Sequence, residues 1–181
     1  MKLETRNQKP ETKSERILII NGPNLNWVGT REPEVYGNQN LEGYLNSLAK
    51  ELATSDQKPE TSDQKPGTRN QEPETRNQKL ETIQTNIEGE IINHLQASEK
   101  DPNTIGVIIN AGGYSHTSVA IADTIRAMSK KVIVVHISNT FDRGVERHKD
   151  LVAAASDGFI GGFGLDGYRI AVDALQLATR N

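Results

Sequence analysis

Short apolar runs alternate with amphipathic stretches along most of this chain. Continuous apolar runs are typical of strands buried on both faces, and apolar residues that recur every three or four positions are typical of helices. The expected strands cover residues 17–20, 80–85, 105–109, 132–136 and 158–160. The expected helices cover residues 41–52, 88–98, 118–128 and 166–179, and Asn40 is the expected N-cap of the first.

This order of elements predicts an α/β fold, with a parallel sheet between two layers of helices (α/β/α). For five strands we expect the doubly wound, flavodoxin-like order 2-1-3-4-5. The switch point of that order lies between the first and third strands. Ligands of open α/β sheets bind at such a point, beyond the carboxyl ends of the strands.

A heptapeptide repeat interrupts the pattern. Threonine recurs at every seventh position from Thr54 to Thr82, in units such as TSDQKPE and TRNQEPE, and a further copy occupies residues 5–11. Residues 54–79 offer no aliphatic or aromatic side chain for a coiled-coil seam, and their prolines oppose a helix. We therefore expect a disordered insertion at about 54–79 and a disordered extension at 1–16, with a single domain spanning 17–181.

Composition narrows the class of partner. None of the 181 residues is cysteine, which excludes a disulfide framework and a thiolate metal site. The formal net charge of −3 gives no reason to expect a nucleic acid. No apolar run has the length of a membrane span, and the N-terminal residues lack the apolar centre of a secretory signal. We expect a cytoplasmic protein without a membrane partner.

Polar side chains gather just after three of the predicted strands. The first strand is followed by Asn24, Arg31 and Tyr36. The third is followed by Asn110, Gly112, Gly113 and His116. The fourth ends in His136 and is followed by Ser138, Asn139, Arg143 and Arg147. Because the carboxyl ends of parallel strands meet at one edge of a sheet, these groups are expected to lie close together.

Such a set of groups suits proton transfer on a polyhydroxylated or carboxylated small molecule. The two arginines would bind a carboxylate with charge-assisted hydrogen bonds. A tyrosine beside an arginine is a usable base, histidine is a complementary acid, and asparagine amides stabilise an oxyanion. Ordinary roles remain open: Tyr36 as a loop residue, Arg31 as a surface charge and His136 as a core histidine.

Several motifs, in this order, closely resemble type II 3-dehydroquinate dehydratase. They are NGPNLNWVGTREPEVYG, QTNIEGEII, INAGGYSHTSVAIAD, VHISN, RGVERH and GFGLDGY. The resemblance covers nearly all of the chain outside the N-terminal extension and the repeat. It implies a flavodoxin-like fold and a homododecamer built as four trimers. It also implies dehydration of 3-dehydroquinate to 3-dehydroshikimate in the shikimate pathway, through an enolate, with no metal or organic cofactor.

The resemblance also implies a role for individual residues. Tyr36 would take the proton from C2, with Arg31 favouring its phenolate. Asn24 and a bound water would stabilise the enolate, and His136 would protonate the departing C1 hydroxyl. The implied substrate-binding residues are Asn110, His116, Ile137, Ser138, Arg147 and, from a neighbouring subunit, Asp123. Arg143 would support them, and residues 29–36 would form a lid.

The chain departs from the family pattern near the catalytic histidine. Val134 stands where the family usually has glutamate, two residues before His136, and residues 149–151 read Lys-Asp-Leu in place of His-Ser-Tyr. Where that glutamate orients the histidine, its loss predicts less effective protonation of the leaving group. One alternative is therefore a catalytically impaired homologue. A second alternative is a flavodoxin-like module that only binds a small molecule.

Overall fold

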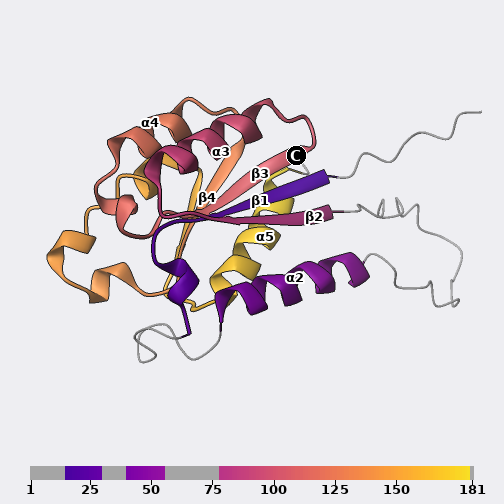
Figure 1. Ribbon diagram of the computed structural model, residues 1–181, viewed down its shortest axis with the longest axis horizontal. Helices are drawn as coiled ribbons and strands as arrows, with labels where there is room; N and C mark the ends of the chain where they lie inside the picture. Colours follow the sequence, from indigo (N-terminus) through magenta and orange to yellow (C-terminus); the bar gives the residue numbers. More distant parts are fainter. Residues whose placement is uncertain (1–14, 30–39, 56–77, 180–181) are drawn as a thin grey trace, which may run out of the picture.

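The computed structural model describes residues 15–29, 40–55 and 78–179. Its centre is a sheet of five strands in the order β2-β1-β3-β4-β5, and every neighbouring pair is parallel (Figure 1). The strands are β1 (Glu15–Asn21), β2 (Gln78–Gln84), β3 (Thr104–Asn110), β4 (Lys131–His136) and β5 (Gly158–Gly161). The predicted fold class and strand order are confirmed.

Helices cover both faces of the sheet. One face carries α2 (Leu41–Ser55) and α5 (Asp166–Ala178), and the other carries α3 (Glu88–Lys100) and α4 (Val119–Arg126) (Figure 1). Alternate residues of each strand point to opposite faces. On β1, for example, Ile17 and Ile19 pack with α2 and α5, whereas Leu18 and Ile20 pack with α3 and α4. The two apolar cores therefore arise from a single continuous apolar run.

The predicted N-terminal extension is two residues too long. Glu15 and Arg16 belong to β1 and pair with the start of β2. The Arg16 guanidinium binds the Glu81 carboxylate on β2 and the Asp101 carboxylate at 2.6 Å. Charged side chains thus extend the strand beyond its apolar run, which a search for apolar residues does not detect.

The predicted insertion at 54–79 is likewise too long at both ends. Residues 54–55 are the last of α2, and residues 78–79 are the first of β2. The Gln78 side chain is buried and donates a hydrogen bond to the Glu15 carboxylate at 3.1 Å. Strand pairing requires backbone partners rather than apolar side chains, so polar residues continue β2. The rest of the predicted insertion lies outside the described residues.

Capping residues define the ends of the helices more precisely than the spacing of apolar residues does. Asn40 caps α2 as predicted, since its Oδ1 accepts from the Glu42 N–H at 2.8 Å. Ser118, expected as the first residue of its helix, is instead the N-cap of α4 and accepts from the Ile121 N–H at 2.9 Å. That helix also ends at Arg126, two residues before its predicted end.

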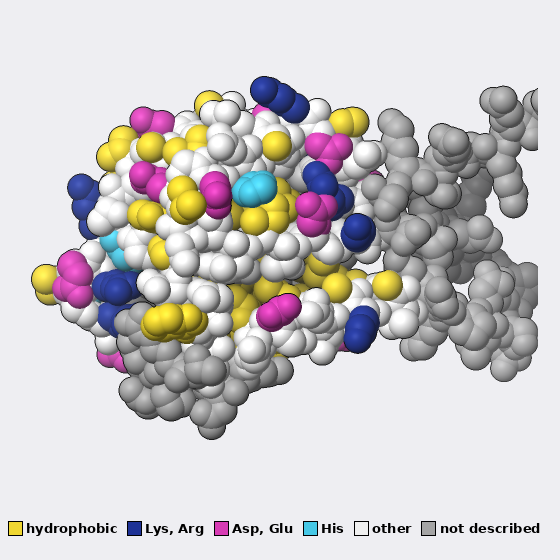
Figure 2. All heavy atoms as spheres, in the orientation of Figure 1, with side chains coloured by type: hydrophobic (Ala, Val, Ile, Leu, Met, Phe, Trp, Pro, Cys, Tyr) yellow, Lys and Arg dark blue, Asp and Glu magenta, His cyan; other side chains and the backbone are white. Residues whose placement is uncertain are grey.

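Charges of both signs are intermixed on the face of the molecule shown in Figure 2, where Lys and Arg side chains form no continuous patch. Among the helices of the described residues, none combines the length and the apolar character needed to cross a membrane.

Candidate active site

The loops after β1 and β3 meet at the switch point of the sheet. Asn21 at the end of β1 pairs with Asn110 at the end of β3, and the Gly22 N–H donates to the Asn110 carbonyl at 2.7 Å. A Cβ at Gly22 would lie 2.6 Å from the carbonyl oxygen of Ala111, and Gly112 has a left-handed φ of +58°. Glycine at both positions therefore allows the two loops to pack this closely.

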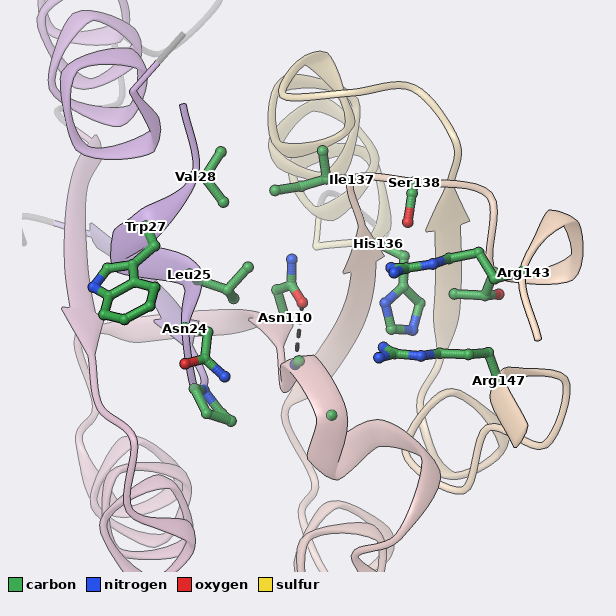
Figure 3. A pocket seen from close by; sticks show the side chains of 14 residues that line it. Asn24, Leu25, Trp27, Val28, Asn110, His136, Ile137, Ser138, Arg143 and Arg147 are labelled. Atoms are coloured by element: carbon green, nitrogen blue, oxygen red, sulfur yellow. Dashed lines mark hydrogen bonds between the residues drawn. The ribbon is translucent and has the colours of Figure 1, made fainter. Parts of the chain in front are cut away.

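A hollow of about 160 Å³ opens where these loops face the segment that follows β4 (Figure 3). Amide, imidazole, hydroxyl and guanidinium groups line it, together with a few apolar side chains. The lining residues are Pro23, Asn24, Leu25, Trp27, Val28, Asn110, Gly112, Gly113, His136, Ile137, Ser138, Thr140, Arg143 and Arg147. Residues that follow three strand ends thus converge on one hollow, as predicted.

The Asn110 side chain is fixed from behind the pocket. Its Nδ2 donates to the Tyr168 hydroxyl at 3.2 Å, and its Oδ1 accepts from the Gly112 N–H at 3.2 Å. The Tyr168 hydroxyl in turn donates to Asn21 Oδ1 at 2.6 Å. Burial raises the pKa of the Tyr168 phenol, which therefore stays protonated. These bonds hold the Asn110 amide in one orientation.

His136 is the last residue of β4 and pairs with a carboxylate. Its Nε2 lies 2.6 Å from Asp150 Oδ2, and only 7% of the His136 side chain and 14% of the Asp150 side chain are exposed. Burial raises the pKa of the Asp150 carboxyl, but hydrogen bonds from His136 and the Ala153 N–H lower it by more, so the net shift is downward. Asp150 is therefore ionised near neutral pH and only accepts hydrogen bonds, which places a proton on His136 Nε2.

His116 lies behind His136 rather than in the wall of the hollow. The two rings are stacked with their centroids 5.8 Å apart. His116 Nδ1 lies 2.9 Å from the carbonyl oxygen of Lys149, so Nδ1 carries a proton and donates it. Within the described part of the chain, the buried Nε2 of His116 has no hydrogen-bond partner.

Two arginines supply positive charge to the pocket. Arg147 is the last residue of η4 (Val145–Arg147), and Arg143 lies two residues before that turn begins. Both side chains extend toward His136 (Figure 3). The backbone at the end of β4 is held in place because the Gly162 and Gly164 N–H groups donate to the carbonyls of His136 and Ile137, at 3.2 and 2.9 Å. An anion entering the hollow would meet both guanidinium groups.

The structure brings together most of the predicted site residues that it describes. Those that line the hollow are Asn24, Asn110, His136, Ile137, Ser138, Arg143 and Arg147. Asp123 lies on α4, away from this hollow, and its exposed carboxylate pairs with Arg126 at 3.0 Å. Tyr36 and Arg31 lie outside the described residues, so their roles stay predictions.

Sequence reasoning missed Tyr168 and Asp150 as parts of the site. Tyr168 falls within an amphipathic helix, where an aromatic residue indicates only the core. Asp150 was recognised as a departure from the family pattern, but nothing in its spacing indicates contact with His136. In the described part of the chain, no cluster of His, Cys, Asp or Glu side chains is arranged to hold a metal ion.

A histidine–carboxylate pair and two arginines follow β4, and the hollow they share with the loops at the switch point is typical of an α/β enzyme that acts on a small anionic molecule. The comparison with known families is specific. The family described as class II dehydroquinase matches residues 15–65 and 59–176, and the chain belongs to this family. The two matched stretches overlap within the heptapeptide repeat.

Curated relatives match over almost the whole chain. A 3-dehydroquinate dehydratase of Exiguobacterium sp. is 42% identical over 166 residues, covering 92% of this chain and 97% of that protein. The 3-dehydroquinate dehydratase 1 of Agrobacterium fabrum is 39% identical, with 92% of this chain and 99% of that protein covered.

Solved structures of the family have the same fold. The type II dehydroquinase of Butyrivibrio crossotus is 37% identical, with a TM-score of 0.74 and coverage of 90% of this chain and 97% of that chain. The type II dehydroquinase of Propionibacterium acnes is 30% identical, with a TM-score of 0.72 and coverage of 93% and 98%.

Proposed function

We propose that the hollow at the carboxyl edge of the sheet is where this chain dehydrates 3-dehydroquinate to 3-dehydroshikimate, a step of the shikimate pathway. Membership of the class II dehydroquinase family supports this reaction. The observation that carries the assignment to the hollow is that His136 and Arg147, a proton donor and a carboxylate ligand, line the same wall.

The reaction removes the elements of water from adjacent carbons. A base takes the proton from C2, and the electron pair is held as an enolate on the C3 oxygen. When the enolate collapses, the C1–oxygen bond breaks, a C1=C2 double bond forms and the leaving oxygen takes a proton to depart as water. The enzyme must therefore supply a base, an enolate-stabilising group and an acid.

The acid in this scheme is His136. As an imidazolium it donates a proton from the ring to the C1 oxygen, and the carboxylate of Asp150 stabilises the positive charge beforehand. Arg147 binds the substrate carboxylate, which sits on the same carbon as the leaving hydroxyl. The carboxylate contact thus places the hydroxyl near the imidazole.

The base and the enolate ligand come from the loop after β1. Tyr36 is the base, and Arg31 favours its phenolate; both lie outside the described residues. Asn24 lines the hollow across from the arginines and stabilises the enolate through a bound water (Figure 3). Asn110, with its fixed amide, binds the ring hydroxyls together with Ser138.

Absorbance of the enone product tests the proposal. Purified protein mixed with 3-dehydroquinate should give a rise in ultraviolet absorbance that persists with a chelator and is lost in Tyr36→Phe and His136→Asn. Tyr44→Phe is a matched control, because the Tyr44 hydroxyl bonds Asp166 at 2.9 Å, outside the hollow. No rise from folded wild-type protein would refute the proposed function.

Arg147→Met tests the carboxylate contact separately. Loss of a charge-assisted hydrogen bond of about 1.5–3 kcal/mol should raise KM roughly tenfold to hundredfold. An unchanged KM would remove Arg147 from the binding site.

We also propose that the protein assembles as a cytoplasmic homododecamer of four trimers, in which Asp123 reaches the site of a neighbouring subunit. Its carboxylate is exposed and lies outside the hollow of its own chain, which supports this role. Light scattering should give a molar mass of about twelve times the 19.9 kDa of one chain. A monomer of full activity would refute both the assembly and the role of Asp123.

A further inference from the structure

Residues 149–153, which follow the arginine-bearing turn η4, pack against the turn η2 (Gly112–His116) and contact both histidines. The N–H groups of Leu151 and Val152 donate to the carbonyl of Ser115, at 2.8 and 3.3 Å. The carbonyl of Lys149 accepts from His116 Nδ1, and the carboxylate of Asp150 accepts from His136 Nε2. Adjacent residues of one segment thus anchor the two stacked rings.

The Asp150 carboxylate is itself held in place. Its Oδ1 accepts from the Ala153 N–H at 2.7 Å, which leaves Oδ2 directed at His136. Val152 is fully buried in the core beneath β4, so the segment is anchored by packing as well as by hydrogen bonds. The carboxylate therefore has little freedom to leave the imidazole.

Within the described part of the chain, Asp150 is the carboxylate that pairs with His136. Val134 lies on the same face of β4, two residues before His136, but it is fully buried among apolar side chains and offers no hydrogen-bond acceptor. Because Asp150 occupies Nε2, the remaining ring nitrogen is Nδ1, which makes no hydrogen bond with a described residue.

We propose that Asp150 is the positioning residue for His136: it holds the proton of the neutral ring on Nε2 and so makes Nδ1 the nitrogen that delivers the catalytic proton. This inference rests on the proposed function for the assignment of His136 as the acid. Val134 in place of glutamate led us to expect less effective protonation of the leaving group. The proposal reverses that expectation, because Asp150, from a different segment of the fold, supplies the missing carboxylate.

Spectroscopy of the wild-type protein tests the positioning without any assay. Nitrogen-15 NMR of the histidine side chains at alkaline pH should show neutral His136 with its proton on Nε2. In Asp150→Asn the side-chain amide can donate as well as accept, so the Nε2–H form should lose its predominance. A wild-type ring protonated on Nδ1 would overturn the proposal.

Kinetics test the consequence for the reaction. In Asp150→Asn and Asp150→Ala, kcat should fall by about 30-fold, part of the roughly 10²–10⁴ that a general acid contributes, while KM changes less than about threefold. The pH profile of kcat should change as well, because both variants remove the carboxylate that faces the His136 ring. The other charged or titratable groups facing His136 are His116, Arg143 and Arg147, and they are unchanged in both variants.

Asp157→Asn is a matched control for a structural role. Asp157 also accepts a backbone N–H, that of Val132 at 2.9 Å, and also binds a cationic side chain, that of Lys131 at 2.8 Å, but it does not line the hollow. The Asp157→Asn variant should leave kcat and its pH profile unchanged.

If the Asp150 variants are folded and match this control, Asp150 is not a positioning residue. If wild-type protein is inactive but its ring is protonated on Nε2, the proposed function fails and the positioning stands.

Discussion

Tyr168→Phe removes one hydroxyl from the buried chain of side chains beneath the active site. That hydroxyl donates to Asn21 Oδ1 at 2.6 Å and accepts from Asn110 Nδ2 at 3.2 Å. All three side chains are almost completely shielded from solvent. The substitution keeps the ring and changes the volume little, so its effect reports on the hydrogen bonds.

The two partners differ in what they can do without the hydroxyl. Asn21 Oδ1 has no other donor among the described residues, and an unsatisfied buried acceptor costs about 1–3 kcal/mol. Asn110 keeps its hydrogen bond from the Gly112 N–H, so we take its contribution as the net value of about 1 kcal/mol for one hydrogen bond. We expect the free energy of unfolding to fall by about 2–4 kcal/mol in total.

Urea unfolding at a fixed protein concentration measures this loss, with Tyr44→Phe as the control. The Tyr44 hydroxyl bonds Asp166 near the surface, where the lost partner is replaced by water, so its removal should cost less than about 1 kcal/mol. Because the Asn110 amide loses one of its two anchors, kcat/KM of Tyr168→Phe should also fall roughly tenfold, or about 1.4 kcal/mol. Equal stability losses in the two variants would refute the buried-chain reasoning.

Three further variants test other parts of the structure. Gly22→Ala should lower the melting temperature strongly and abolish activity, because its Cβ would meet the backbone carbonyl of Ala111 at 2.6 Å; a normal melting curve would contradict this. Gly43→Ala, at an open position on α2, should instead raise stability by about 0.5–1 kcal/mol in the same melting experiment. Burial raises the pKa of the Asp157 carboxyl, but the Lys131 ammonium and a backbone N–H lower it by more, so its stabilisation is present above the unfolded pKa of about 3.9 and is lost as pH falls through the lower folded value. Asp157→Asn should therefore be less stable than wild type in urea at pH 7, and the difference should close as pH falls below the unfolded pKa of about 3.9 and through the lower folded value; a constant difference would contradict the assignment.

The apolar pattern was sufficient to predict the fold class and the strand order. Runs such as residues 105–109 are long enough and apolar enough to identify buried strands, and the motifs between them identified the family, which the comparisons confirm. The apolar pattern did not predict the polar residues at the ends of the strands. Arg16 and Gln78 extend strands because charged and amide partners pair with them, and those partners are distant in sequence.

The site was predicted as a set of residues but not as a set of contacts. Position after a strand was enough to bring His136, Asn110 and Arg147 together, since the sheet edge fixes their location. The partners that orient these groups follow no such rule. Asp150 comes fourteen residues after His136, in a segment without periodicity. Tyr168 lies on α5, in one of the helix layers that cover the sheet.

The attachment points of the heptapeptide repeat have a consequence for changes in its length. Because β2 runs parallel to its neighbours, its first residue, Gln78, lies at the edge of the sheet opposite the strand ends that form the hollow. α2 ends at Ser55, within the first unit of the repeat (Figure 1). A change in the number of seven-residue units would therefore enter the chain at the edge of the sheet opposite the hollow. The same separation makes this junction a natural place to graft a reporter or an affinity handle.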